Sequence, residues 1–155
     1  ALTCTTHQSK TKRSSATTVL LGTAMVRIQD STGQLQPVRA LIDAGSQSSF
    51  ITEACVQRLY LPRQKQFQPI LGLSETPISS HKGTVLCFIK PSMQNNPTLE
   101  TKAIILNRIT SPLPSATLHD EVKSFFKGWS LADPEFYIPG KIDFLIGADL
   151  FPQLF

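Results

Sequence analysis

The sequence has few cysteines and no long apolar run, and both absences exclude common classes of protein. Cys4, Cys55 and Cys87 are far apart and show none of the paired spacings of zinc sites or disulfide frameworks. No stretch approaches the roughly 20 apolar residues of a transmembrane helix, and residues 1–15 lack the apolar core of a signal peptide. We therefore expect an intracellular chain in a reducing compartment, with no membrane partner.

Charged residues are also scarce. They make up 17% of the chain, whereas hydrophobic residues make up 41% of its 155 residues, which is enough apolar material for one core. Eleven prolines and eight glycines favour many short strands joined by turns over a helical bundle. The sequence therefore predicts one mainly β domain.

The formal net charge of +4 does not by itself indicate a nucleic-acid partner. Lys10, Lys12 and Arg13 lie in residues 1–17, which contain almost no large apolar side chains. Such a segment cannot offset its ordering entropy by burial, so we interpret residues 1–17 as a flexible linker and residues 18–155 as the domain. The remaining charge is scattered and lacks the interleaved aromatic residues of nucleic-acid surfaces, so we do not expect nucleic acid as a partner of this domain.

Alternating apolar residues predict a β-hairpin at the start of the domain. In residues 19–29 and again in residues 35–43, apolar positions alternate with more polar ones, as in half-buried strands. The turn sequence Asp-Ser-Thr-Gly at 30–33 separates the two segments, and the second one ends at Asp43. The apolar positions are Leu20, Ala24, Val26 and Ile28 in the first segment, and Val38, Ala40 and Ile42 in the second.

Shorter signals predict the other elements. Thr52 is a candidate N-cap of a short helix that contains Ala54, Val56, Leu59 and Tyr60 and ends at Pro62. We also expect a hairpin in residues 66–90, a buried strand in 101–109, a short helix in 119–127 and an apolar strand in 142–146. The aromatic residues Phe125, Phe126, Trp129 and Phe136 are expected to cover an edge of the β structure.

Asp43 is the candidate for chemistry. A carboxylate that ends an apolar strand is costly to bury without a purpose, and Gly45 allows the backbone to turn tightly beside it. An ordinary strand-to-turn corner is the alternative, because Asp-x-Gly is a common triplet. The later run Phe144-Leu-Ile-Gly147 favours the functional interpretation, since such a strand can cross behind the loop that follows Asp43.

Three stretches together resemble a known protease family. They are VLLGTAMVRI from residue 19, ALIDAGSQSSFIT from residue 40 and LADPEFYIPGKIDFLIGADLF from residue 131. The order apolar-apolar-Asp-x-Gly-Ser, then apolar-apolar-Gly, is similar to that of retropepsin-like aspartic proteases, and the three stretches are similar to the protease region of BEL/Pao-type retrotransposon polyproteins. The resemblance implies a mainly β, barrel-like acid protease subunit with one or two short helices. Residues 1–17 would then be a linker from the upstream polyprotein.

The resemblance also implies an aspartic endopeptidase that processes a retrotransposon polyprotein. Asp43 would be the catalytic residue, Ala44, Gly45 and Ser46 would complete the active-site loop, and Leu145, Ile146 and Gly147 would form the strand that supports it. The sequence has no second Asp-x-Gly, so the second carboxylate would come from another copy in a homodimer. Two carboxylates about 3 Å apart share one proton, so that one can activate water while the other polarises the scissile carbonyl.

Residues 70–84 match the position of the family's flap, the hairpin that closes over a bound peptide. Its residues Gly72, Leu73, Ser74, Glu75 and Thr76 would contact an extended polypeptide substrate, held like an added strand; an ordinary surface hairpin is the alternative. No cofactor and no metal are implied. The expected locations are the cytoplasm and virus-like particles.

Three departures from the family pattern affect the expected activity. Ala44 replaces the Ser or Thr whose hydroxyl braces the two loops of the dimer, and a hydrogen bond of this kind contributes roughly 0.5–1.5 kcal/mol. Gln47 and Ala148 stand where many members pair an Asp with an Arg, which we interpret as an alternative packing solution. Residues 148–155 are too few for the usual C-terminal dimer strand. The departures leave a second interpretation open, a catalytically silent module for peptide binding or assembly.

Overall fold

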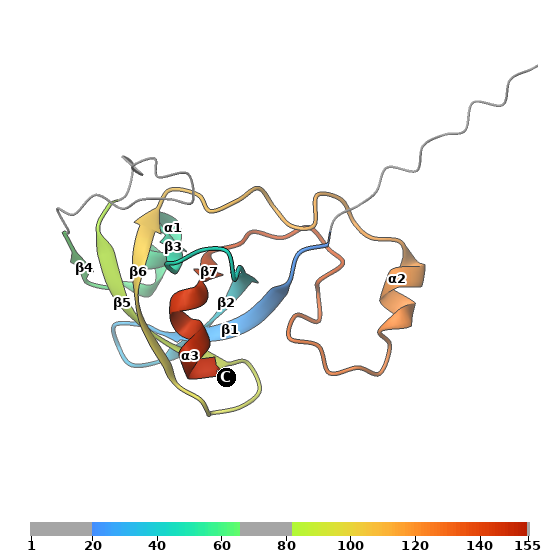
Figure 1. Ribbon diagram of the computed structural model, residues 1–155, viewed down its shortest axis with the longest axis horizontal. Helices are drawn as coiled ribbons and strands as arrows, with labels where there is room; N and C mark the ends of the chain where they lie inside the picture. Colours follow the sequence, from blue (N-terminus) through green and yellow to red (C-terminus); the bar gives the residue numbers. More distant parts are fainter. Residues whose placement is uncertain (1–19, 66–81, 155) are drawn as a thin grey trace, which may run out of the picture.

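The structure is a computed structural model, and it describes residues 20–65 and 82–154. The described elements are seven strands, three α-helices and one 3-10 helix (Figure 1). The strands are β1 (Thr23–Gln29), β2 (Leu35–Ile42), β3 (Phe50–Thr52), β4 (Arg63–Gln64), β5 (Thr84–Pro91), β6 (Leu99–Leu106) and β7 (Phe144–Ile146). The helices are α1 (Glu53–Leu59), α2 (Asp120–Phe125), η1 (Ala148–Leu150) and α3 (Phe151–Leu154).

Six of the described strands close into a mixed barrel. The order is β1-β2-β7-β3-β6-β5, and an additional pairing between β1 and β5 closes the ring. The pairs β2–β7 and β3–β6 are parallel and the other pairs are antiparallel, and β4 pairs with Thr84 and Val85 at the start of β5, whereas β1 pairs with its end. Closure pairs the strand edges that an open sheet would leave exposed. The expected mainly β fold with short helices is therefore confirmed.

The predicted hairpin is formed by β1 and β2, with Val26 opposite Val38 and Ala24 opposite Ala40. These four residues are buried in the barrel, as the alternation predicts. The prediction was wrong for Leu20 and Ile42, which are both exposed. Leu20 precedes the first residue of β1, and Ile42 is the last residue of β2, so neither is enclosed by the barrel.

Helix α1 begins as its sequence predicts. The Thr52 hydroxyl accepts a hydrogen bond from the Cys55 N–H at 3.2 Å, which satisfies one of the free donors of the first turn. The helix buries Cys55 and Leu59, whereas Ala54, which we expected within this apolar set, is exposed. Tyr60 is the exposed C-cap, with a left-handed backbone (φ 53°), and not a residue of the helix.

The later strands match the predicted apolar runs. Strand β6 lies within residues 101–109 for most of its length and buries Ala103, Ile104 and Ile105, and all three residues of β7 are buried. Of the hairpin expected in residues 66–90, the structure describes β5, which pairs antiparallel with β4. Residues 66–81 lie outside the described residues, and with them the predicted flap residues Gly72–Thr76.

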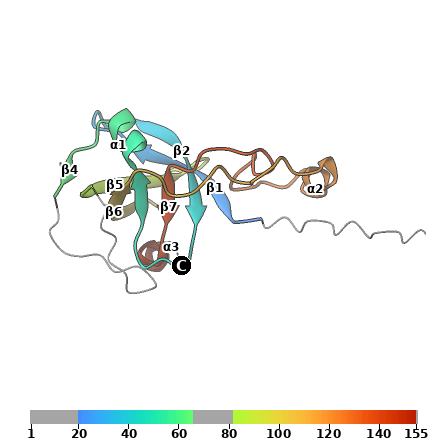
Figure 2. The same cartoon turned by 90° about the horizontal axis from the view of Figure 1, so that it is seen from above.

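Between β6 and β7, residues 107–143 form an excursion that we call the arm. Figures 1 and 2 both show its helix, α2, well apart from the barrel. Phe126 makes edge-to-face contacts with Phe125, Trp129 and Phe136, at centroid distances of 5.0, 6.2 and 5.5 Å. Phe125 is 74% exposed and Trp129 68% exposed, so the prediction that these two rings cover an edge of the β structure was wrong. In the described part of the chain, no helix has the length and apolar character needed to cross a membrane.

Candidate active site

Asp43 directly follows β2, at one end of the barrel. Its N–H donates to the Ile146 carbonyl at 3.0 Å, which continues the parallel pairing of β2 with β7 by one residue. The side chain is partly exposed, in contrast to the fully buried Ala40 earlier in the same strand. The barrel therefore fixes the backbone of Asp43 while leaving its carboxylate accessible to solvent.

The loop after Asp43 is a tight turn held by its own backbone. The Gly45 N–H donates to Asp43 Oδ1 at 2.9 Å, and the Ser46 N–H donates to the Asp43 carbonyl at 3.3 Å. Among the described residues, Gly45 is the only hydrogen-bond donor to this carboxylate, so Oδ2 has no protein donor in this set. Ala44 and Gly45 are exposed, so the tip of the loop faces solvent. A carboxylate in this position can interact with water or with a second molecule.

The end of β7 packs directly against this loop. The Ala148 N–H donates to the Ser46 carbonyl at 2.7 Å, and the Gly147 N–H donates to Ser49 Oγ at 3.0 Å. A Cβ atom on Gly147 would lie 2.3 Å from the Ser48 carbonyl oxygen, so only glycine allows this approach. The structure thus brings the predicted loop, Ala44 to Ser46, together with the predicted supporting residues Leu145, Ile146 and Gly147.

Sequence reasoning missed Asp149, whose carboxylate braces the same region. Ser49 Oγ donates to Asp149 Oδ1 at 2.8 Å, and Thr101 Oγ1 of β6 donates to Asp149 Oδ2 at 2.6 Å. Ser49 is fully buried, and its carbonyl accepts from the Ile104 N–H at 2.9 Å. The loop is therefore joined to β6 and η1 beside Gln47 and Ala148, the positions where many retropepsins pair an Asp with an Arg.

The LADPEF stretch, which carried much of the resemblance, also has a structural role. Asp133 is 2% exposed, and its Oδ2 accepts from Arg39 Nε at 2.7 Å and from Thr23 Oγ1 at 2.5 Å. The neighbouring Ala132 carbonyl accepts from the Met25 N–H at 2.8 Å. This stretch therefore attaches the arm to both strands of the first hairpin.

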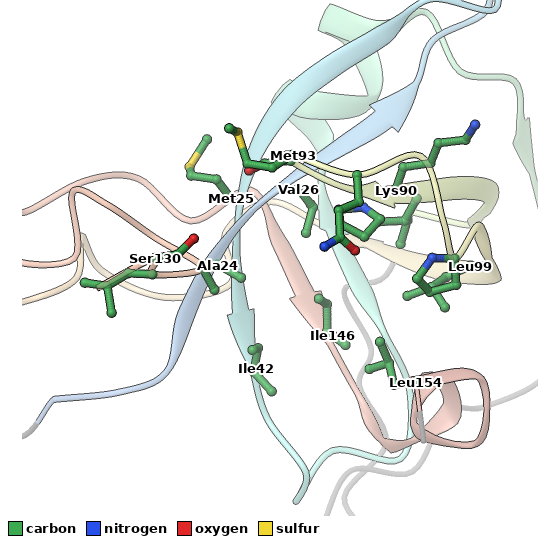
Figure 3. Close-up of a pocket in the computed structure, with 17 residues that line it drawn as sticks. Ala24, Met25, Val26, Ile42, Lys90, Met93, Leu99, Ser130, Ile146 and Leu154 are labelled. Atoms are coloured by element: carbon green, nitrogen blue, oxygen red, sulfur yellow. The ribbon is translucent and has the colours of Figure 1, made fainter. Parts of the chain in front are cut away.

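An apolar pocket of about 400 Å³ opens on the side of the barrel that carries the Ile42 side chain (Figure 3). Ile42, the residue before Asp43, and Ile146 of β7 line it, together with Leu154 of α3. Ala24 and Val26 contribute the surface of the barrel core. Ile42 is 43% exposed, so this pocket offers accessible apolar surface one residue before Asp43, on the opposite side of β2 from the candidate carboxylate.

The described cysteines do not suit a nucleophilic role. Cys55 and Cys87 are buried free thiols. Burial raises the pKa of the Cys55 thiol, and it raises the pKa of Cys87 to about 12. Because the thiolate is the reactive form, these two side chains are unreactive near neutral pH. Within residues 20–65 and 82–154, no three His, Cys, Asp or Glu side chains gather in a way that could hold a metal ion.

The site is therefore a single accessible carboxylate on a braced loop at the end of a closed barrel. Such a group can act as a general base or, when protonated, as a hydrogen-bond donor. A scan against protein-family models and a search of curated proteins found no match to this chain.

Proposed function

We propose that this chain is a retropepsin-like aspartic endopeptidase that acts as a homodimer. The observation that carries the proposal is the placement of Asp43: it ends a barrel strand, its carboxylate is accessible, and Gly45 and the end of β7 fix its loop. The sequence resemblance to the protease region of BEL/Pao-type polyproteins supports the same activity. It adds the substrate class, an extended segment of a retrotransposon polyprotein.

The chemistry requires a second carboxylate across a water molecule from Asp43. Three other acids near the loop and the arm's ends already have partners, because Asp149 binds Ser49, Asp133 binds Arg39 and Asp143 binds Thr52. In the proposed enzyme, the second carboxylate therefore comes from another copy of the chain. A second copy related by a two-fold axis would supply its own Asp43.

In such a dimer the two carboxylates share one proton. Like charges this close cannot both ionise cheaply, so the pair titrates in two macroscopic steps. The ionised member takes a proton from water, which attacks the scissile carbonyl, while the protonated member donates a hydrogen bond to the carbonyl oxygen. Activity should therefore follow a bell-shaped dependence on pH.

The surface around Asp43 supports self-association. Ala44 and Gly45 are exposed at the loop tip, and the pocket that Ile42 and Leu154 line presents further exposed apolar surface at this end of β2. Accessible apolar patches of this kind are typical of protein interfaces. Ala44 has no hydroxyl to brace the partner loop, so we expect a dimer that dissociates on dilution.

The test compares the wild type with Asp43→Asn on a peptide that spans a polyprotein junction, at several protein concentrations and mildly acidic pH. We expect cleavage by the wild type only, with specific activity that rises with concentration. Asp120→Asn is the matched control, since it makes the same chemical change at an exposed acid on α2. Equal cleavage by Asp43→Asn would refute the role of Asp43, and specific activity independent of dilution would refute the weak dimer.

Ala44 also supports a second candidate, a catalytically silent module that retains the barrel and binds peptide. This candidate predicts that concentrated wild-type protein binds the junction peptide without turnover. Asp43→Asn should then bind the peptide with the same affinity as the wild type.

A further inference from the structure

The side of β2 that faces away from the barrel core leads directly to Asp43. Side chains alternate along a strand, so Arg39 and Leu41 lie on the opposite side from the buried Val38 and Ala40. Asp43 continues this alternation, because its N–H extends the pairing with β7. The candidate carboxylate therefore belongs to the same outer face as Arg39 and Leu41.

This outer face is covered by the two ends of the arm, residues 109–113 and 138–142, which we call the arm base. The ends are joined by an antiparallel bridge in which Leu113 and Gly140 exchange hydrogen bonds of 3.0 Å in both directions. Beneath them lies a second apolar cluster, separate from the barrel core. Its members are Leu41, Ile142 and Leu145, with Phe50, Ile109 and Leu113 packed against them.

One guanidinium holds the arm base in place. Arg39 Nη1 donates to the Leu113 carbonyl at 2.8 Å and to the Ile138 carbonyl at 3.3 Å, and so reaches both ends of the arm. Nη2 donates to the Glu135 carbonyl at 3.2 Å, and Nε donates to Asp133. The Arg39 side chain is 11% exposed and that of Asp133 is 1% exposed. The forked donors of arginine fit such a set of acceptors, and the single ammonium of lysine does not.

The guanidinium of Arg39 can occupy this position only because residue 140 has no side chain. A Cβ atom there would lie 2.3 Å from Arg39 Nη1. Any side chain at residue 140 would therefore displace the guanidinium, or the arm base, without removing a charge. The chain thus offers two separate ways to disturb the same contact.

We infer that Arg39 is a positioning residue of the proposed active site: it holds the arm base as an apolar wall beside Asp43, against which a side chain of the bound peptide packs. The inference rests on the proposed function. A peptide with its scissile bond at Asp43 would lie at the end of this covered face, where the arm residues Ile109 and Leu113 pack on the cluster of Leu41 and remain partly exposed. The wall favours a large apolar residue next to the scissile bond.

The test uses Arg39→Lys, which retains the charge beside Asp133, and Gly140→Ala, which retains Arg39 itself. The matched control is Arg27→Lys, because Arg27 likewise donates to backbone carbonyls, but to those of Pro91 at the end of β5 and Gln94 in the loop after it. Thermal unfolding establishes that each variant is folded. Then kcat and KM are measured on two junction peptides that differ only in carrying leucine or alanine beside the scissile bond.

We expect the wild type to prefer the leucine peptide, and both Arg39→Lys and Gly140→Ala to lose about tenfold of that preference, the size typical of an apolar subsite. The loss should appear in KM, since the contacts within the Asp43 loop are intact in both variants. Arg27→Lys should keep the wild-type preference. If Arg39→Lys keeps it as well, the inference is wrong and the proposed function stands. If the wild type cleaves neither peptide, the proposed function fails and the inference fails with it.

Discussion

The Asp43 loop and the arm base lie on the same face of the protein but are held by different kinds of contact. The loop is fixed by backbone groups of Asp43, Gly45 and Ser46, by the end of β7 and by short polar side chains. The arm base is fixed mainly by one charged side chain, Arg39, and by the buried acid that it pairs with. Their sensitivity to substitution should therefore differ in kind.

This difference shows how one barrel can hold two neighbouring parts, the loop of the proposed catalytic residue and the arm base, by different means. Backbone hydrogen bonds do not depend on side-chain identity, so substitution of the exposed Ala44 should leave the geometry of the loop intact. A buried ion pair depends on both partners, because removal of one leaves the other charged and unpaired. The comparison can be tested by substitutions that remove each kind of contact in turn.

The largest effect is expected for Arg39→Met, which keeps the apolar stem but leaves the Asp133 carboxylate without its counter-charge. We expect the free energy of unfolding to fall by about 3–5 kcal/mol, as measured by urea denaturation. Arg27→Met is the control, since Arg27 binds carbonyls near the surface and its loss should cost about 1 kcal/mol. Equal losses in the two variants would mean that the ion pair with Asp133 does not anchor the arm.

The next effect concerns the close approach of β7 to the loop. Gly147→Ala places a methyl group against the Ser48 carbonyl, so either the loop or β7 must shift. Overpacking of this kind costs about 1–3 kcal/mol, and the displaced loop should also lower kcat. Gly22→Ala is the matched control, because a Cβ there meets no atom within 4 Å. A Gly147→Ala variant with wild-type stability and kcat would show that this contact does not position Asp43.

A smaller difference in stability is expected between two threonines in the neighbouring strands β6 and β5, because in the described part of the chain one hydroxyl makes a hydrogen bond and the other does not. Thr101→Val removes a donor to Asp149, and we expect a loss of about 1 kcal/mol. Thr84→Val is the counterpart in β5, because among the described residues the buried Thr84 hydroxyl has no hydrogen-bond partner. That substitution should leave stability unchanged or raise it. Urea denaturation of both variants checks the prediction, and a larger loss for Thr84→Val than for Thr101→Val would contradict it.

The contrast between the two regions also explains which parts were predictable from sequence. The hairpin of β1 and β2 and the turn after Asp43 are encoded within short segments, by alternation and by the triplet Asp-x-Gly. The contacts that organise the surrounding face join residues far apart in the chain: Arg39 and Asp133 are 94 positions apart, and Ser49 and Asp149 are 100 apart. No local pattern specifies such a pairing, so the roles of Arg39 and Asp149 required the structure.

The same reasoning accounts for the individual errors. Periodicity identified the strand that contains Ile42 but not the point at which the barrel ceases to enclose it. The aromatic residues of the arm were expected on the β structure because aromatic side chains are usually buried, whereas Phe125 and Trp129 are exposed to solvent. In both cases the residue type was interpreted correctly as apolar, and its neighbours depended on tertiary structure.

The smallest effect is a pH dependence in the turn between β1 and β2, far from both regions of the comparison. Hydrogen bonds from the Thr32 hydroxyl and the Gln36 amide lower the pKa of Asp30 from 3.8 to about 2. A depressed pKa means that the ionised carboxylate stabilises the fold above pH 4, and that this contribution is lost as the pH falls through 2. The stability of the wild type should therefore approach that of Asp30→Asn between pH 4 and pH 2, as measured by thermal unfolding. Because Asp30 is only partly buried in a surface turn, the change should be small, and a constant difference over this range would show that the turn does not depend on the charge.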